Sequence, residues 1–223
     1  MGAVAHIDDY KKGHYFKKEA RGNLSWNGWE HNVLLRNEGT DATGKPQFTD
    51  VAMALGADDI IDSRGIALFD MDHDGDLDLA ISHNPGDIHP EGIAPGLLRN
   101  DIGQQRNWLV VSLRGTQSNR DGIGAEVTIA ADKARHHRLS SAGSSYASQH
   151  SRRLYFGLNQ AERVDRLTVR WPGGKEESFE NINANQLVVI TEGQGIELKV
   201  LPKLAPKSVA STKQNSPING GPR

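Results

Sequence analysis

The sequence of 223 residues contains no cysteine, which excludes disulfide bonds, thiolate metal sites and a cysteine nucleophile. Its formal net charge of -2 is small, so no global field draws the protein to nucleic acid or to an anionic membrane. No apolar run is as long as a membrane-spanning helix, and residues 1–21 lack the apolar core of a signal peptide. We therefore expect neither a nucleic-acid partner nor a membrane span.

Signatures of common catalytic and nucleotide-binding sites are also missing. There is no Gly-x-Ser-x-Gly nucleophile elbow, and Gly122 and Gly124 lack the third glycine and the following helix of a dinucleotide-binding loop. His136 and His137 are neighbours in an expected strand, where adjacent side chains point to opposite faces and are poorly placed to share a metal ion. The sequence therefore identifies no catalytic residue.

What the chain does contain is a run of alternating aspartates between two apolar segments. Its carboxylates occupy every second position: Asp70, Asp72, Asp74, Asp76 and Asp78. Charges this close repel one another by several kcal/mol unless a cation lies among them. Oxygen ligands suit a hard cation, and calcium is the usual one in such loops.

The spacing assigns a role to each position of the run. The first, third, fifth and ninth positions offer side chains, Asp76 at the seventh offers its backbone carbonyl, and Gly75 at the sixth permits the sharp turn. The glutamate that closes a helical EF-hand would fall at Ile81, and the flanking segments 65–69 and 77–82 read as strands. We predict a calcium loop that joins two strands of a β-hairpin. The alternative is a solvated acidic turn that binds nothing.

The rest of the chain indicates short strands. Glycine is abundant (24 residues) and hydrophobic content is modest (36%), as expected for strands joined by many turns. The tetrapeptide Leu-Leu-Arg-Asn at 34–37 returns at 97–100, 63 residues later, and short-strand repeats of this length are typical of propeller blades. We predict an all-β fold in which one or more partial β-propeller blades, including the calcium hairpin, pack against a C-terminal antiparallel β domain.

This prediction divides the chain into four segments. Residues 1–22 are a polar extension and 23–106 a partial propeller that contains the calcium loop. Closely spaced strands make 107–200 the C-terminal β domain. The segment 201–223 is rich in Lys, Pro, Ser and Asn and too poor in apolar residues to fold, so we expect a disordered tail.

Two parts of the chain resemble known families. Residues 69–82 resemble the FG-GAP or VCBS-type repeat of integrin-like β-propellers, although those propellers normally carry several Asp-rich loops and this chain has one. From residue 107 the chain resembles the ASPIC/UnbV domain. The motifs that carry this resemblance are Asn107-Trp108-Leu109, Gly115-Thr116-Gln117-Ser118-Asn119-Arg120-Asp121, Ile123-Gly124-Ala125, Ser148-Gln149, Phe156-Gly157-Leu158 and Val169-Arg170-Trp171-Pro172-Gly173-Gly174. Since no general catalytic activity is established for the domain, the resemblance implies a fold and calcium more than a chemistry.

One polar loop allows a different interpretation. The loop contains Asn119, Arg120 and Asp121, and Gln149 and Arg170 could join it in space to form a ligand pocket. A pocket of this kind would make the protein an enzyme, or an accessory subunit, in a biosynthetic pathway. The sequence favours a structural turn, in which these groups satisfy buried backbone atoms.

The favoured function is a calcium-stabilised, extracytoplasmic binding or assembly module without catalysis of its own. An incomplete propeller exposes strand edges, so we expect a protein partner or a second copy to add to them. A glycan is a further candidate partner, because Trp26 and Trp29 could stack on a sugar, although rings in a turn more often cap a core. A deep pocket converging on Asp121, Gln149 and Arg170 would favour the enzyme instead.

Overall fold

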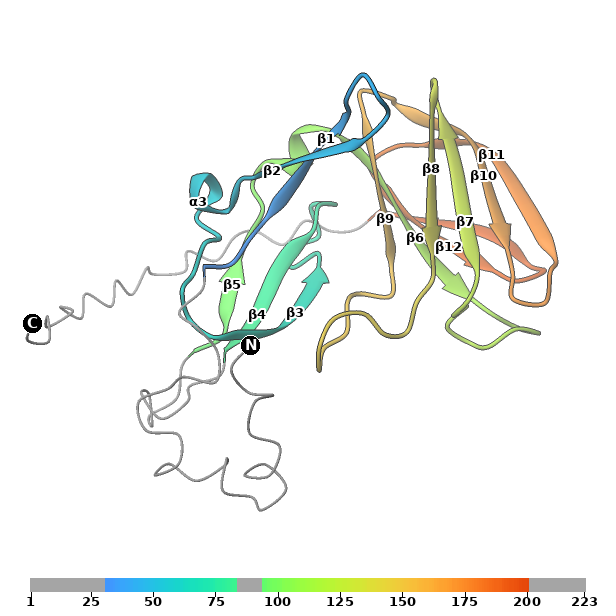
Figure 1. The fold of residues 1–223 in the computed structure, drawn as a ribbon. Coiled ribbons are helices and arrows are strands. Elements are labelled where there is room, and N and C mark those ends of the chain that lie inside the picture. The colour runs from blue at the N-terminus through green and yellow to red at the C-terminus, as the bar shows by residue number, and fades with distance from the viewer. Residues whose placement is uncertain (1–30, 84–93, 201–223) are drawn as a thin grey trace, which may run out of the picture. The chain divides into compact units, whose positions relative to one another are not determined.

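The computed structural model describes residues 31–83 and 94–200 (Figure 1). The expectations for the extension 1–22, for Trp26 and Trp29, and for the tail 201–223 lie outside these residues. Within them the fold is all-β, as predicted, with only short helical turns. No helix in this part of the chain has the length and apolar character needed to cross a membrane.

The chain forms two compact units that interleave along the sequence. The first contains the described residues of Met1–Phe69, Asp78–Arg99 and Gly143–His150. The second contains those of Asp70–Leu77, Asn100–Ala142 and Ser151–Arg223. The division into four consecutive segments that we expected from the sequence stays a prediction.

The first element described in the first unit is a hairpin that forms a sheet of its own. Strand β1 (Leu35–Thr40) pairs with β2 (Pro46–Asp50), and the Asp41 carboxylate accepts hydrogen bonds from the backbone N–H groups of Thr43 (2.8 Å) and Lys45 (3.0 Å) in the turn between them. Every residue of both strands is exposed. A two-stranded hairpin is only marginally stable by itself, so additional contacts would stabilise this element.

A short helix, α3 (Ala52–Leu55), leads to a three-stranded antiparallel sheet. Its order is β3 (Ser63–Phe69), β4 (Asp78–His83) and β5 (Gly96–Leu98). The two Leu-Leu-Arg-Asn copies therefore enter different sheets, the first through β1 and the second through β5. Propeller blades remain a prediction.

Side chains of the segment 143–150 cover the edge of β3 that does not pair with β4. Ile66 N–H donates to Ser145 Oγ (3.3 Å), Ser148 Oγ donates to the Ile66 carbonyl (2.7 Å), and Leu68 N–H donates to His150 Nδ1 (3.3 Å). At the opposite edge, β5 pairs with β4 and with no other strand of the described chain. Within the described residues, one edge of this sheet is thus protected, and the other has no strand partner.

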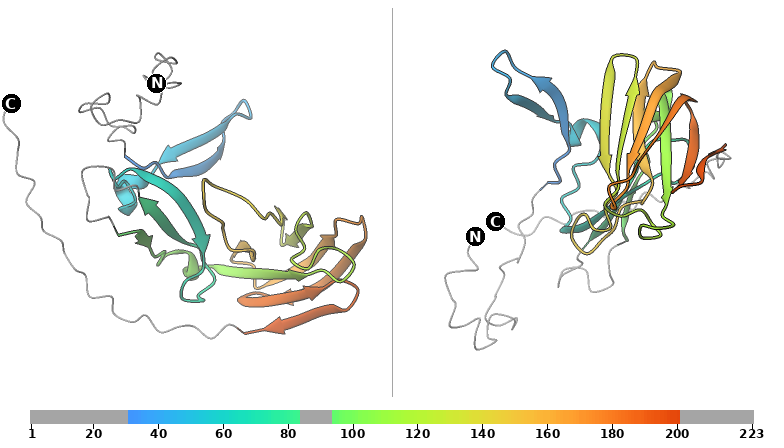
Figure 2. Two further views of the ribbon diagram at one scale, coloured as in Figure 1. Left: turned by 90° about the horizontal axis from the view of Figure 1, so that it is seen from below. Right: turned by 90° about the vertical axis from the view of Figure 1, so that its right-hand side faces the viewer.

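The second unit is a sandwich of two four-stranded sheets, which Figure 2 shows as two layers. A 3₁₀ turn, η3 (Gly103–Gln105), precedes its first strand. The first sheet is antiparallel, with the order β11 (Glu176–Asn183), β10 (Arg163–Arg170), β7 (Glu126–Ala131) and β8 (Ala134–Leu139). The second sheet has the order β13 (Gly195–Lys199), β12 (Gln186–Thr191), β6 (Asn107–Arg114) and β9 (Leu154–Asn159).

The second sheet departs from the antiparallel domain that we expected. Strands β12 and β6 run parallel, with Gln186 opposite Leu109 and Thr191 opposite Arg114. Both are central strands with runs of consecutive buried residues, as parallel strands covered on two faces require. Alternating patterns along one chain show which segments are strands, but they do not show which distant segments pair.

The inner faces of the two sheets form the main core of the second unit. Its largest fully buried side chains come from both sheets and include Leu109, Phe156, Leu167, Ile190 and Trp171. A smaller apolar cluster lies apart from this core and consists of Trp108, Val110, Leu187 and Val189, with Tyr155 packed against it. We call it the outer cluster.

Candidate functional site

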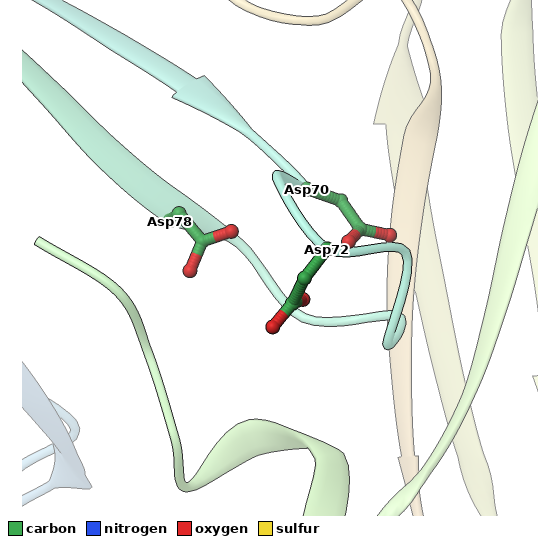
Figure 3. Close-up of side chains that lie close together, drawn as sticks. All are labelled: Asp70, Asp72 and Asp78. Atoms are coloured by element: carbon green, nitrogen blue, oxygen red, sulfur yellow. The ribbon is translucent and has the colours of Figure 1, made fainter. Parts of the chain in front are cut away.

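The acidic run forms the connection between β3 and β4, as the sequence predicts. Pairing of Phe69 with Asp78 closes the hairpin, so the first and last aspartates stand side by side where the strands separate. One carboxylate oxygen from each of Asp70, Asp72 and Asp78 lies within 4.8 Å of the other two (Figure 3). The Asp74 carboxylate does not belong to this group. Its role as a ligand, and that of the Asp76 backbone carbonyl, stay predictions.

Hydrogen bonds within the loop set its shape. The Asp70 carboxylate accepts the backbone N–H groups of Asp74 (3.1 Å) and Gly75 (3.2 Å), and the Asp74 carboxylate accepts that of Asp76 (3.2 Å). The left-handed conformation of Gly75 (φ 97°) turns the chain at the sixth position. Asp70 therefore has a structural role in addition to any role as a ligand, and so does Asp74.

The carboxylates lie in an unfavourable environment for bare anions. Asp70 and Asp78 are 7% and 0% exposed. Burial raises the pKa of Asp70, and the neighbouring charge of Asp74 raises it further. Oδ1 of Asp72 is buried and accepts no hydrogen bond. A hard divalent cation would satisfy that oxygen and offset the repulsion, so the residues fit calcium.

The polar loop 115–124 is organised by its own hydrogen bonds. The Asn119 side chain donates to the carbonyl of Ile123 (2.7 Å) and accepts its N–H (2.8 Å), and Gly115 N–H donates to the carbonyl of Arg120 (3.0 Å). A Cβ on Gly115 would lie 2.1 Å from the carbonyl oxygen of Asn119, so only glycine fits there. These contacts are those of a structural turn.

The other residues of the predicted pocket have separate partners. Asp121 pairs with Arg152, and Arg170 pairs with Glu126. Arg170 lies in an open groove of about 630 Å³ on the outer face of the sheet β11-β10-β7-β8, and the lining of that groove does not include Asn119, Arg120 or Asp121. Gln149 belongs to the first unit. A pocket made from all five residues remains a prediction.

A buried carboxylate that the sequence analysis missed holds this loop in place. Glu192, only 4% exposed, follows β12 and accepts the backbone N–H groups of Ser118 (2.7 Å), Gln117 (2.9 Å) and Thr116 (3.0 Å). The Ser118 hydroxyl adds a further hydrogen bond of 2.9 Å. The contacts with Ser118 and its neighbours lower the pKa of Glu192 to about 2. No local pattern signals this role, because the loop is more than 70 residues earlier in the chain.

The substitution Glu192→Gln is expected to weaken the dependence of stability on acid pH. The folded pKa of about 2 lies below the ordinary value of 4.5, so the contribution of Glu192 is complete above about pH 4.5 and disappears as the pH falls towards 2. Urea unfolding in chelator at neutral pH and at about pH 3 should show a smaller loss of stability in the variant than in the wild type. Glu176→Gln, at an exposed position, is the matched control and should behave as the wild type. Equal losses in the wild type and Glu192→Gln would contradict the assignment.

Comparison with known proteins finds similarity over part of the chain. Residues 115–197 match the family model described as "ASPIC and UnbV". The chain is 35% identical over 117 residues to cartilage acidic protein 1 of Xenopus tropicalis, covering 51% of this chain and 17% of that protein. It is 33% identical over 112 residues to the mouse and human proteins of that name, covering 50% of this chain and 16% of each.

These matches confirm the ASPIC/UnbV resemblance for the region that they cover. The aligned region is about a sixth of the length of these relatives. The FG-GAP or VCBS resemblance of the acidic hairpin remains a prediction.

Proposed function

We propose that the chain is a calcium-stabilised, extracytoplasmic binding or assembly module without catalysis of its own. The observation that carries the proposal is the convergence of the Asp70, Asp72 and Asp78 carboxylates at the base of the β3–β4 connection. Strand flanks, alternating aspartates and a central glycine fit an FG-GAP or VCBS-type calcium hairpin. Removal of the ion tests the calcium component, and the mass of the protein in solution tests the assembly component.

The state of the polar loop supports a non-catalytic role. Asn119 uses both ends of its amide on the backbone of Ile123, and Glu192 uses its carboxylate on the backbone of 116–118. Groups that are engaged in this way are not available as acids, bases or nucleophiles without disruption of the loop. The biosynthetic enzyme or accessory subunit therefore remains the second alternative, with no specific observation in its favour.

A location outside the cytoplasm is supported by the relatives and by the chemistry of the loop. The matched proteins are named for cartilage, a tissue with abundant extracellular matrix. Calcium sites in extracellular modules bind with dissociation constants of roughly 10⁻⁴–10⁻³ M, which suits a loop that lacks the closing glutamate of an EF-hand.

The exposed apolar residues of the first unit support an assembly role. Leu35 and Phe48 on the β1–β2 hairpin are 57% and 55% exposed, and Val33 just before it is 63% exposed. A groove of about 230 Å³ nearby is lined in part by Val33, Ile66 and Ile81. Apolar side chains gathered beside strands with open edges favour a second protein chain as the occupant.

Sedimentation at micromolar concentration is expected to show a species heavier than the 24.4 kDa monomer, because the β1–β2 hairpin gains stability when another chain covers it. The double variant Leu35→Lys/Phe48→Lys should shift the distribution towards monomer. Leu139→Lys, at a position 54% exposed in the second unit, is the matched control and should not. A wild-type protein that is strictly monomeric, and that captures no partner through this hairpin, would refute the assembly component.

A further inference from the structure

The loop residues 70–77 and Trp108 belong to the same compact unit, the second, and the loop packs directly on this tryptophan. A Cβ built on Gly75 would lie 1.9 Å from Cε2, 2.1 Å from Cδ2 and 2.3 Å from Nε1 of Trp108. These atoms belong to the indole ring, so the backbone at the sixth loop position rests against the ring. Gly75 is required twice, once for its φ of +97° and once for this contact.

Trp108 is held in place by the sheet on which it lies. The backbone N–H of Trp108 donates to Oδ1 of Asn185 (3.1 Å), and the backbone carbonyl of Trp108 accepts the backbone N–H of Asn185 (2.7 Å). Asn185 lies immediately before β12 with a φ of 60°. Its side-chain oxygen and its backbone N–H both face the start of β6. The backbone of Trp108 therefore cannot withdraw from the loop without the loss of both hydrogen bonds.

The outer cluster depends on a cover. Its residues on β6 and β12 alternate with those that point into the main core, so they face away from it. Trp108 is nevertheless only 8% exposed, and Val110 and Leu187 are 0% and 4% exposed. The tip of the acidic loop supplies part of that cover through Gly75.

A second close contact involves the same loop. A Cβ on Gly103, in the turn that leads into β6, would lie 2.5 Å from Cβ of Asp76 and 2.8 Å from its Oδ2. The loop tip thus touches both Trp108 and the segment just before it. Both contacts involve the half of the loop between Asp72 and Asp78, which are two of the three convergent carboxylates.

We propose that cation binding in the acidic loop and burial of Trp108 are thermodynamically coupled, with Trp108 acting as a positioning residue for the loop. This inference rests on the proposed calcium site. Without a cation the crowded carboxylates repel one another, and the loop relaxes away from the indole ring. With the cation bound, the loop closes over the outer cluster. Because coupling is reciprocal, loss of the ring must weaken cation binding as much as loss of the cation exposes the ring.

Quenching of tryptophan fluorescence by acrylamide measures the first half of this coupling. The full chain with Trp26→Phe and Trp29→Phe retains Trp108 and Trp171, and Trp171 is 1% exposed in the main core. We expect quenching to rise when calcium is replaced by chelator and to fall again when calcium is restored. The additional substitution Trp108→Phe should abolish this calcium-dependent change.

Calorimetric titration with calcium measures the reciprocal half. Trp108→Ala and Gly75→Ala are each expected to weaken calcium binding by about fivefold or more, a change in affinity that is typical of coupling between two sites. Gly174→Ala is the matched control, because Gly174 has a similar φ of +85° with no atom within 4 Å of its Cβ position. Its calcium affinity should equal that of the wild type. Circular dichroism verifies that each variant is folded.

The possible results separate this inference from the proposed function. Calcium binding that Asp72→Ala abolishes, together with Trp108 quenching that calcium does not change, would overturn the coupling and leave the calcium site intact. Absence of calcium binding in the wild type would overturn both. The quenching experiment keeps the test decisive even if Gly75→Ala or Trp108→Ala fails to fold, because it uses the native loop and ring.

Discussion

Removal of calcium is expected to lower the thermal midpoint of the wild-type protein by about 3–6 °C. An ion present at about ten times its dissociation constant adds about 1.4 kcal/mol to the free energy of unfolding. The effect arises because the folded loop gathers Asp70, Asp72 and Asp78, whereas an unfolded chain does not. Differential scanning calorimetry with calcium and with chelator measures the shift.

Asp72→Ala is the sharpest variant for this test. Asp72 offers a buried oxygen that accepts no hydrogen bond, whereas Asp70 also holds the backbone of Asp74 and Gly75. Replacement of Asp72 should therefore remove the calcium response and leave the chelated protein as stable as before. Asp165→Ala, at an exposed position on β10, removes the same charge elsewhere and should retain the full response. A wild-type midpoint that is identical with calcium and with chelator would refute the calcium site.

Trp171→Ala is expected to reduce the free energy of unfolding by about 3–5 kcal/mol, the largest effect that we predict. Trp171 is 1% exposed in the main core, immediately after β10, and a Cβ on Gly122 would lie 3.4 Å from its Cζ3. Truncation leaves a cavity between the sheet and the polar loop. Urea unfolding at neutral pH measures the loss.

A conservative variant separates volume from hydrogen bonding at this position. Nε1 of Trp171 is buried without a hydrogen-bond partner, so Trp171→Phe removes volume but no hydrogen bond. We expect it to cost clearly less than Trp171→Ala. Leu139→Ala, at an exposed apolar position, should change stability little. Equal stability of Trp171→Ala and the wild type would mean that this core does not stabilise the unit.

Several strands were predictable because their pattern is local. The region 107–200, which we expected to contain closely spaced strands, includes the central strands β12 and β6. Each central strand carries a run of apolar residues bounded by turn residues, and this pattern can be seen without knowledge of any partner strand. Strand β11 is less evident from the sequence. Most residues of β11 are exposed, so its apolar signal is weak.

The acidic hairpin was predictable for a similar reason. Its aspartates, its glycine and its flanking strands lie within about 20 consecutive residues, so one segment carries the whole pattern. The structure adds which carboxylates converge. Asp70, Asp72 and Asp78 do so, whereas the Asp74 carboxylate accepts the N–H of Asp76. Local spacing alone does not show which carboxylates also hold the backbone of the turn, as those of Asp70 and Asp74 do.

By itself, the sequence determined the all-β class, the ASPIC/UnbV resemblance and the position of the acidic loop between two strands. Only the tertiary structure decided that β6 pairs parallel with β12, that Glu192 holds the loop at 116–118, and that Gly75 rests on Trp108. The physical reason is range. Strand propensity and turn chemistry act between near neighbours in the chain, whereas these three contacts join segments that are brought together only when the core forms.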